Sequence, residues 1–459
     1  MTAAGRTVDR WGASGIGALG GRHPADLLVM PLLAVGFFLG PLKLLGTSWF
    51  TYVGADALAL LVLLVVFAER MVSRRPLFAA SPLSVPLLLL AAGCVLEMAN
   101  PDAPLIRSAA GLRSWLLYLG FYFVGLYTLR SVRQLERLYS FLLALGALTA
   151  VYGVYQWRAG PQSLAGWSEY YGRNAGLVWM AQSGAVFRAF STFVSPGAFG
   201  GNMALLMLLA FSVAISQTIP KRWRLVAASA LATMGVGIAA SGSRGAVAHL
   251  LVAGAIGLVF VPGVRQRVRA GFMAVVILGV AVVVVFFLMG PVISERFSSI
   301  ADPDAFFWKW FLPFTNGIRI AQEHPFGMGL GYTAGVPQFI ANPVFAEFPT
   351  TSVDSGYGSA AAELGFLGLA LFIYFAVKVG MEGFRTWKRL PSGRMRDLFL
   401  GPALYAATYP IVSVIFQPQA ALPSAIYFWL LIGMLMKAPQ LRKAPDADKL
   451  LRSEMHAGQ

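Results

Sequence analysis

Three arginines and one aspartate stand in sequence contexts that could do chemistry. Arg188 lies in VFRAFSTFV, Arg244 in SGSRG, Arg319 in NGIRIAQEHP and Asp354 in VDSGYG. Guanidinium groups bind phosphate oxygens in a bidentate way and stay charged at neutral pH. A carboxylate beside them can take a proton from a hydroxyl group. Brought together, these residues would bind a diphosphate and activate a hydroxyl nucleophile.

Each of these residues also has a structural explanation. An arginine at the end of a membrane helix reaches toward lipid headgroups with its charged tip. Asp354 precedes an apolar run, where aspartate is a preferred N-cap and interacts well with the helix dipole. Arg244 departs most from the lipid explanation, because Ser241, Gly242, Ser243 and Gly245 leave little side-chain bulk and let a backbone or ligand approach closely. The other acids expected on this side lie in more freely solvated loops: Glu169, Glu295, Asp302, Asp304, Glu323 and Glu347.

Two further titratable residues belong to the same stretch. His324 is the one histidine expected on the outer side, where it is a candidate base, a candidate ligand for the leaving group, or a loop residue with no chemical role. Glu363 follows Asp354 two turns into the next apolar segment, and we expect it to pair with an arginine or a polar neighbour. The GMGLGY run from Gly327 is not a dinucleotide loop, since no strand precedes it. No acid pair or histidine cluster has metal-ligand spacing, so we expect no metal and no cofactor.

The elements that must position these residues are membrane helices. Of the 459 residues, 57% are hydrophobic and only 12% are charged. This hydrophobic fraction is more than the core of a soluble protein of this size could bury. A span needs about 20 apolar residues. Twelve such runs are expected near residues 27–46, 52–68, 84–99, 108–128, 138–157, 195–217, 225–241, 246–263, 271–293, 356–378, 398–416 and 421–437. The fold class is therefore an all-α polytopic membrane protein.

The net charge of +16 fits this topology and needs no nucleic acid. If the N-terminus is cytoplasmic, every second loop carries a cluster of Arg or Lys, as the positive-inside rule requires. We expect a cytoplasmic tail over about residues 1–26, a membrane domain over 27–437 and a second cytoplasmic tail over 438–459. The two substantial outer segments run from about 158 to 194 and from about 294 to 355, the second between the ninth and tenth helices.

Four motifs in this order resemble the O-antigen ligase and polymerase superfamily of bacterial membrane glycosyltransferases. Arg188 ahead of SPGAFGGNMALL, SGSRGA around Arg244, HPFGMGLG after Arg319 and DSGYGSAAAELGFLG from Asp354 match its motifs, and together they cover about residues 185–375. The resemblance implies Asp354 as the catalytic base and the three arginines as the diphosphate site, with His324, Tyr357 and Glu363 as accessory candidates.

The resemblance also implies the reaction and its partners. These are an inverting, metal-independent transfer at the periplasmic face of the inner membrane, a polyprenyl-diphosphate-linked glycan donor and a glycan acceptor. A chain-length regulator is a candidate partner on which the sequence does not decide. Ligases of the family carry His-Asn where this chain has Asp354 and Ser355. That difference favours a polymerase of O-antigen or exopolysaccharide over a ligase that transfers the glycan to lipid A core. A membrane transporter or flippase is the more distant alternative.

Overall fold

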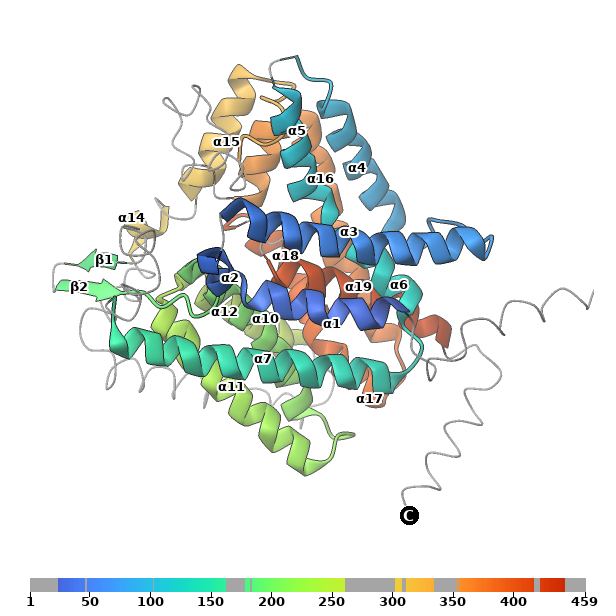
Figure 1. Cartoon of the computed structure of the whole chain (residues 1–459), viewed down its shortest axis with the longest axis vertical. Helices are drawn as coiled ribbons and strands as arrows, with labels where there is room; N and C mark the ends of the chain where they lie inside the picture. The colour runs from blue at the N-terminus through green and yellow to red at the C-terminus, as the bar shows by residue number, and fades with distance from the viewer. Residues whose placement is uncertain are drawn as a thin grey trace, which may run out of the picture.

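The computed structural model describes residues 24–45, 48–101, 103–161, 178–181, 184–260, 302–307, 311–333, 353, 355–416 and 422–441 (Figure 1). The helices of its first half are α1 (Pro24–Phe37), α2 (Leu39–Leu45), α3 (Ser48–Val72), α4 (Ser84–Glu97), α5 (Leu105–Leu112), the π-helical turn η2 (Arg113–Leu117), α6 (Phe121–Thr128) and α7 (Val132–Ala159). Those of the second half are α10 (Pro196–Ile215), α11 (Lys221–Ser241), α12 (Arg244–Phe260), α14 (Pro303–Phe306), α15 (Leu312–Glu323), α16 (Gly356–Arg389), α17 (Arg394–Leu398), α18 (Leu400–Val412) and α19 (Ser424–Leu441).

The prediction of a helical membrane protein is confirmed in its general form. Six of the described helical segments are long and apolar enough to cross a membrane: Leu105–Thr128, Val132–Ala159, Pro196–Ile215, Lys221–Ser241, Gly356–Arg389 and Ser424–Leu441. Helical structure also lies at the place of every other expected span except the one near 271–293, which is outside the described residues. The total of twelve spans and the large outer loop before α16 stay predictions.

The expected outer segment near 158–194 contains an antiparallel hairpin of β1 (Val178–Ala181) and β2 (Gly184–Phe187). Its register pairs Val178 with Phe187 and Ala181 with Gly184. The hairpin ends one residue before Arg188 and therefore sets the direction from which that side chain enters the helical body.

Serine residues are the N-caps of α7 and α10. The Ser131 hydroxyl accepts a hydrogen bond from Gln134 N at 3.3 Å to begin α7. Ser195 does the same for Ala198 N at 3.1 Å, and Pro196 occupies the first position of α10. These bonds satisfy main-chain N–H groups that have no partner inside the helix.

The core is formed by helices that are distant in sequence. α10 packs against α11 and α18, α6 against α19, and α16 against α4, α15 and α18. The α6 and α19 backbones touch at Gly125 and Gly433, where an added side chain would collide with the main chain at Leu430 and Tyr122. Such small residues let membrane helices approach closely and gain van der Waals contact. In Figure 1, α4, α5, α15 and α16 converge at one end of the molecule, while α7 and α11 lie together at the other.

Candidate active site

The structure brings Arg188 and Arg244 into one place. Ala189 N donates to Ala240 O at 3.0 Å, and Arg188 Nε donates to Ser241 O at 3.1 Å. These bonds fix the chain leaving β2 against the last turn of α11. Arg244 begins α12 three residues after Ser241, so both guanidinium groups belong to the junction between α11 and α12.

The junction is a tight turn that depends on its small residues. Gly242 ends α11 in the left-handed conformation, with φ 58° and ψ 29°, which glycine adopts without steric cost. Ser243 N donates to the Ser241 hydroxyl at 3.2 Å and closes the turn. The space expected beside Arg244 is partly occupied by α10, because a side chain at Gly200 would collide with Ser243. The small residues therefore serve helix packing as well as access to the arginine.

The two arginines influence each other electrostatically. Burial and, secondarily, the nearby Arg244 guanidinium lower the pKa of Arg188 from 12.5 to about 10. Arg188 therefore stays charged at neutral pH beside a second cation. A phosphate group bound there would relieve this repulsion and would match the planar donor pattern of both guanidinium groups.

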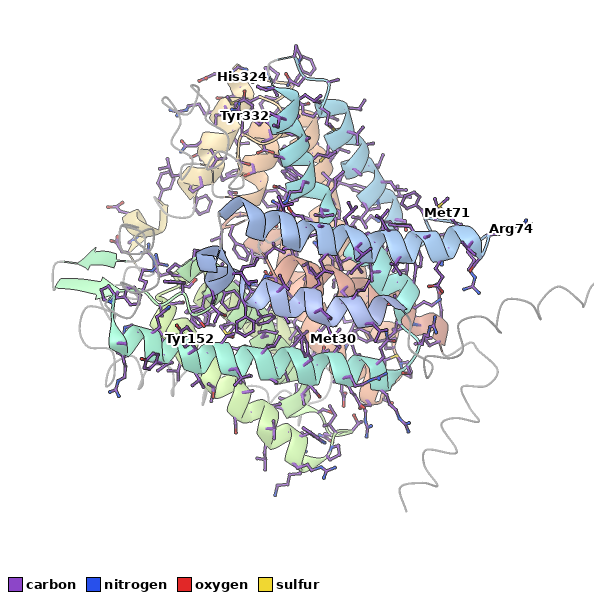
Figure 2. The ribbon with its side chains drawn as sticks, viewed as in Figure 1. Met30, Met71, Arg74, Tyr152, His324 and Tyr332 are labelled. Carbon is purple, nitrogen blue, oxygen red and sulfur yellow. The ribbon has the colours of Figure 1, made fainter. Side chains whose placement is uncertain are left out.

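Arg319 and His324 are placed by a different helix. Both belong to α15 or its end, and Arg319 is exposed while His324 is half-buried. α15 packs closely on the beginning of α16, since a side chain at Gly317 would collide with the main chain at Gly358. Figure 2 shows His324 at the end of the molecule where α15 lies. Arg319 therefore belongs to the α15–α16 pair, whereas Arg188 and Arg244 lie at the α11–α12 junction.

The beginning of α16 is fixed by serine residues. Ser355 is fully buried and is the N-cap, with its hydroxyl accepting from Gly358 N at 3.2 Å. Gly356 N and Tyr357 N both donate to Ser413 O, at 2.8 and 3.2 Å. Asp354 itself lies outside the described residues. Because Ser355 caps the helix, the N-cap explanation considered for Asp354 is taken by its neighbour.

Tyr357 has a structural partner. Its hydroxyl donates to Pro410 O on α18 at 2.7 Å, and its ring packs edge-on against Phe372, with ring centroids 5.4 Å apart. These contacts join α16 to α18 and engage the hydroxyl group that an accessory role would need.

Glu363 is fully buried and accepts hydrogen bonds from polar neighbours. Trp115 Nε1 donates to Glu363 Oε2 at 2.7 Å, and both the main-chain N and the hydroxyl of Thr333 donate to Oε1 at 2.5 Å. The expectation of a polar partner therefore fits the structure, with Trp115 and Thr333 as the partners. Neither partner has a signal in the sequence, because Trp115 is 248 residues and Thr333 is 30 residues away from Glu363.

The glycine-rich run before Thr333 packs against α16 and α5. Gly327, Gly329 and Gly331 have φ values of 92°, 91° and 88°, a region that other residues rarely adopt. Side chains there would collide with the Glu363 carbonyl, with Ala103 and with the Arg107 carbonyl, respectively. The repeated glycines therefore meet a requirement of backbone conformation and close packing.

Sequence reasoning gave no role to Arg107, which the structure places beside this run. Arg107 is buried, and its guanidinium lies 4.8 Å from the centre of the Tyr332 ring. The one available signal was a basic residue on the expected outer side. Figure 2 labels Tyr332 and His324 at the same end of the molecule.

Comparison with known families identifies part of the chain. Residues 229–373 match the family model described as O-antigen ligase, a range that contains Arg244, Arg319, Asp354 and Glu363. Arg188 precedes this range, so its place in the site rests on the contacts with α11. No match to a curated protein was found. Over residues 229–373, and with its membrane helices, the chain is therefore similar to the O-antigen ligase family.

Proposed function

We propose that the protein is an inverting, metal-independent glycan polymerase. It joins polyprenyl-diphosphate-linked oligosaccharide repeat units of O-antigen or exopolysaccharide at the periplasmic face of the inner membrane. The O-antigen ligase domain and the membrane-spanning helices support this class of reaction. The observation that carries the proposal is the junction between α11 and α12, where Arg188 and Arg244 come together.

In this proposal Arg188 and Arg244 bind the diphosphate of the donor, and Arg319 completes the site from α15. Charge grows on the diphosphate as its bond to the sugar breaks, and fixed guanidinium groups stabilise that charge. The site is partly removed from water, which strengthens these interactions. The arginines supply positive charge that other enzymes obtain from a divalent cation, so the reaction needs no metal.

Asp354 is the proposed base. It takes the proton from the acceptor hydroxyl while that oxygen forms a bond to the anomeric carbon of the donor. The bond from the anomeric carbon to the diphosphate breaks on the opposite side, and polyprenyl diphosphate leaves. Ser355 supports this role for Asp354 because it already caps α16, so the aspartate is not needed to begin the helix.

The acceptor distinguishes the polymerase from the second candidate, an O-antigen ligase. A polymerase uses a sugar hydroxyl of another repeat unit, whereas a ligase uses lipid A core. The Asp354-Ser355 pair in place of His-Asn favours the polymerase. A transporter is less well supported, since the unusual charged residues lie at helix ends and carriers place theirs near the midplane of the membrane.

The test is a reaction with purified protein in the presence of EDTA. Wild type and Asp354→Asn are incubated with the host's polyprenyl-diphosphate-linked repeat unit, and the products are separated by size. A ladder from wild type alone supports the polymerase and the role of Asp354. A single transfer that requires lipid A core would make the protein a ligase, and no product from either protein would favour the transporter.

Arg244→Lys is the matched variant for the diphosphate site. It keeps the charge but loses the planar pair of donors, so product formation should fall by about tenfold or more, as loss of a charged hydrogen bond of about 1.5–3 kcal/mol would cause. Exposed Arg222→Lys in the first turn of α11 is the control and should leave the ladder unchanged. Full activity of Arg244→Lys would return this arginine to a lipid-binding role.

A further inference from the structure

Three segments that are distant in sequence meet at one buried carboxylate. Glu363 lies in α16, Trp115 in η2, and Thr333 at the end of the glycine-rich run. The carboxylate is fully buried and accepts from the Trp115 indole on one oxygen and from Thr333 twice on the other. Trp115 is held in turn by Phe372 of α16, with an edge-to-face contact and ring centroids 5.5 Å apart.

The three bonds favour a carboxyl group over an amide. The indole N–H, the main-chain N–H and the hydroxyl of Thr333 act as donors in all three bonds. Both oxygens of a carboxyl group can accept hydrogen bonds, so the group satisfies all three donors. A glutamine has the same shape, but its amide group would point an N–H at one of the donors and leave that donor buried without an acceptor.

The carboxylate fixes a segment that leads to the proposed base. Met328 N donates to Ala362 O at 2.9 Å, and Phe366 N donates to Pro325 O at 3.0 Å. The glycine-rich run therefore packs beside Gly365, where non-helical angles of φ 65° and ψ −164° interrupt α16. Thr333 ends this run at Glu363. Residue Val353, next to Asp354, is tied to the same helix, because the Ser359 hydroxyl donates to Val353 O at 3.1 Å.

We propose that Glu363 is a positioning residue for the glycan transfer. It acts through Thr333 and Trp115, holding the glycine-rich run and η2 against the first turns of α16, without touching the substrate. This inference rests on the proposed function, since it assigns a role in the same reaction. An alternative in which Glu363 only stabilises the fold predicts that its loss lowers the amount of folded protein and leaves the turnover of each folded molecule unchanged.

The kinetic test uses Glu363→Gln in the purified full-length protein. A displacement on the order of 1 Å at a reacting group can cost about 100-fold, so we expect kcat to fall by about that factor. The KM for the lipid-linked donor should change by less than about twofold, because the arginines are untouched. Glu382→Gln is the matched control, since Glu382 is also a buried glutamate of α16 but pairs with Arg385 in the opposite half of the helix. It should keep the wild-type kcat.

A rescue experiment tests the mechanism. In Glu363→Gln the amide oxygen should face the two donors of Thr333, which leaves the amide N–H facing the Trp115 indole. Trp115→Phe removes the opposing N–H and keeps an aromatic ring beside Phe372. The double variant should therefore recover at least about tenfold of the lost kcat, as relief of one donor–donor conflict of about 1.4 kcal/mol would give. No recovery would contradict the assigned bonds.

A second measurement does not depend on the reaction. Amide hydrogen exchange of residues 325–333 should be faster in Glu363→Gln than in wild type and unchanged in Glu382→Gln, because the anchor at Thr333 is weakened. If wild type forms no product, the proposed function fails, while the exchange result still decides whether Glu363 holds this segment.

Thr333→Val covers the case in which Glu363→Gln does not fold. It removes one donor and keeps the main-chain bond, so kcat should fall by about tenfold with KM unchanged. Wild-type kcat in Thr333→Val, or in a folded Glu363→Gln, would overturn the proposal. Loss of folded protein without loss of kcat per folded molecule would overturn it as well.

Discussion

Replacing Arg188 with methionine should make the ligand-free protein more stable and inactive. Burial, together with the nearby Arg244 guanidinium, lowers the pKa of Arg188 from 12.5 to about 10, so the charged form is disfavoured in the folded protein. This cost is fully present at neutral pH, below both pKa values, and disappears only as the pH rises from about 10 toward 12.5. Methionine has a similar length and adapts to irregular packing.

The magnitude follows from the same values. Each pKa unit corresponds to about 1.4 kcal/mol, so a fall from 12.5 to about 10 corresponds to a cost of about 3 kcal/mol. Arg188 is only partly buried, and the variant also loses its hydrogen bond to Ser241 O, which contributes about 1 kcal/mol. The net gain in the free energy of unfolding should therefore be about 2 kcal/mol or less.

The assay is thermal unfolding of purified protein in detergent, followed by tryptophan fluorescence with and without the lipid-linked donor. Without donor, the Tm of Arg188→Met should exceed that of wild type. With donor, the Tm of wild type should rise because binding stabilises the folded state, while that of the variant should not. Arg188→Lys keeps a charge in the same place and should show no gain, and Arg222→Met, at an exposed position of α11, should leave Tm unchanged.

The reasoning would be refuted by a less stable Arg188→Met that still forms product. That result would mean that the arginine stabilises the fold and has no role in binding an anion. A variant that is less stable and also inactive would leave the electrostatic cost without support, and Arg188 would then be a structural residue of the α11 junction. Arg188→Met must show both results: a higher Tm without donor, and no further rise of the Tm when donor is added.

Three further predictions concern the same region. Gly365→Ala should destabilise the protein by about 2 kcal/mol or more, since Gly365 has φ 65° and a side chain would collide with the Pro325 carbonyl; an unchanged Tm would contradict this packing. Ser355→Ala should cost about 1 kcal/mol through loss of the N-cap, and thermal unfolding compared with exposed Ser73→Ala measures it. Binding of the donor should weaken as the pH rises past about 10, because Arg188 loses its charge there; binding that stays constant from about one unit below that pKa to about one unit above it would exclude Arg188 from the diphosphate site.

Some features of this protein are local in the chain, and the sequence determines them. A run of about 20 apolar residues is helical and membrane-spanning wherever it lies, and the helices from Pro196–Ile215 and Gly356–Arg389 occur where the sequence predicts them. Glycine adopts positive φ without steric cost, so the spacing of Gly327, Gly329 and Gly331 is consistent with the unusual backbone found there. The order of four short motifs was enough to indicate the superfamily that the family model supports.

The N-cap of α16 shows where local reasoning stops. Aspartate and serine both cap helices well, and Asp354 and Ser355 are adjacent. The N-cap of α16 is the residue that has extended backbone angles and a side chain directed at the main-chain N–H three residues later. Ser355 has φ −141° and ψ 138° and is anchored near Ser413 of the α18 end. A contact with another helix therefore decides between two residues that are equivalent in sequence.

Tertiary structure alone decided which distant residues meet. Arg188 reaches the α11 junction because Ala189 pairs with Ala240, and Glu363 finds Trp115 and Thr333 because η2 and the glycine-rich run pack on α16. Hydropathy and periodicity fix which face of a helix is apolar, but many helices can pack on one another with similar apolar faces. The pairing is set by shape at glycine contacts and by buried polar bonds, which depend on residues far apart in the chain. The sequence therefore determined the helices and the kinds of chemistry available, and only the fold determined which of those residues lie together.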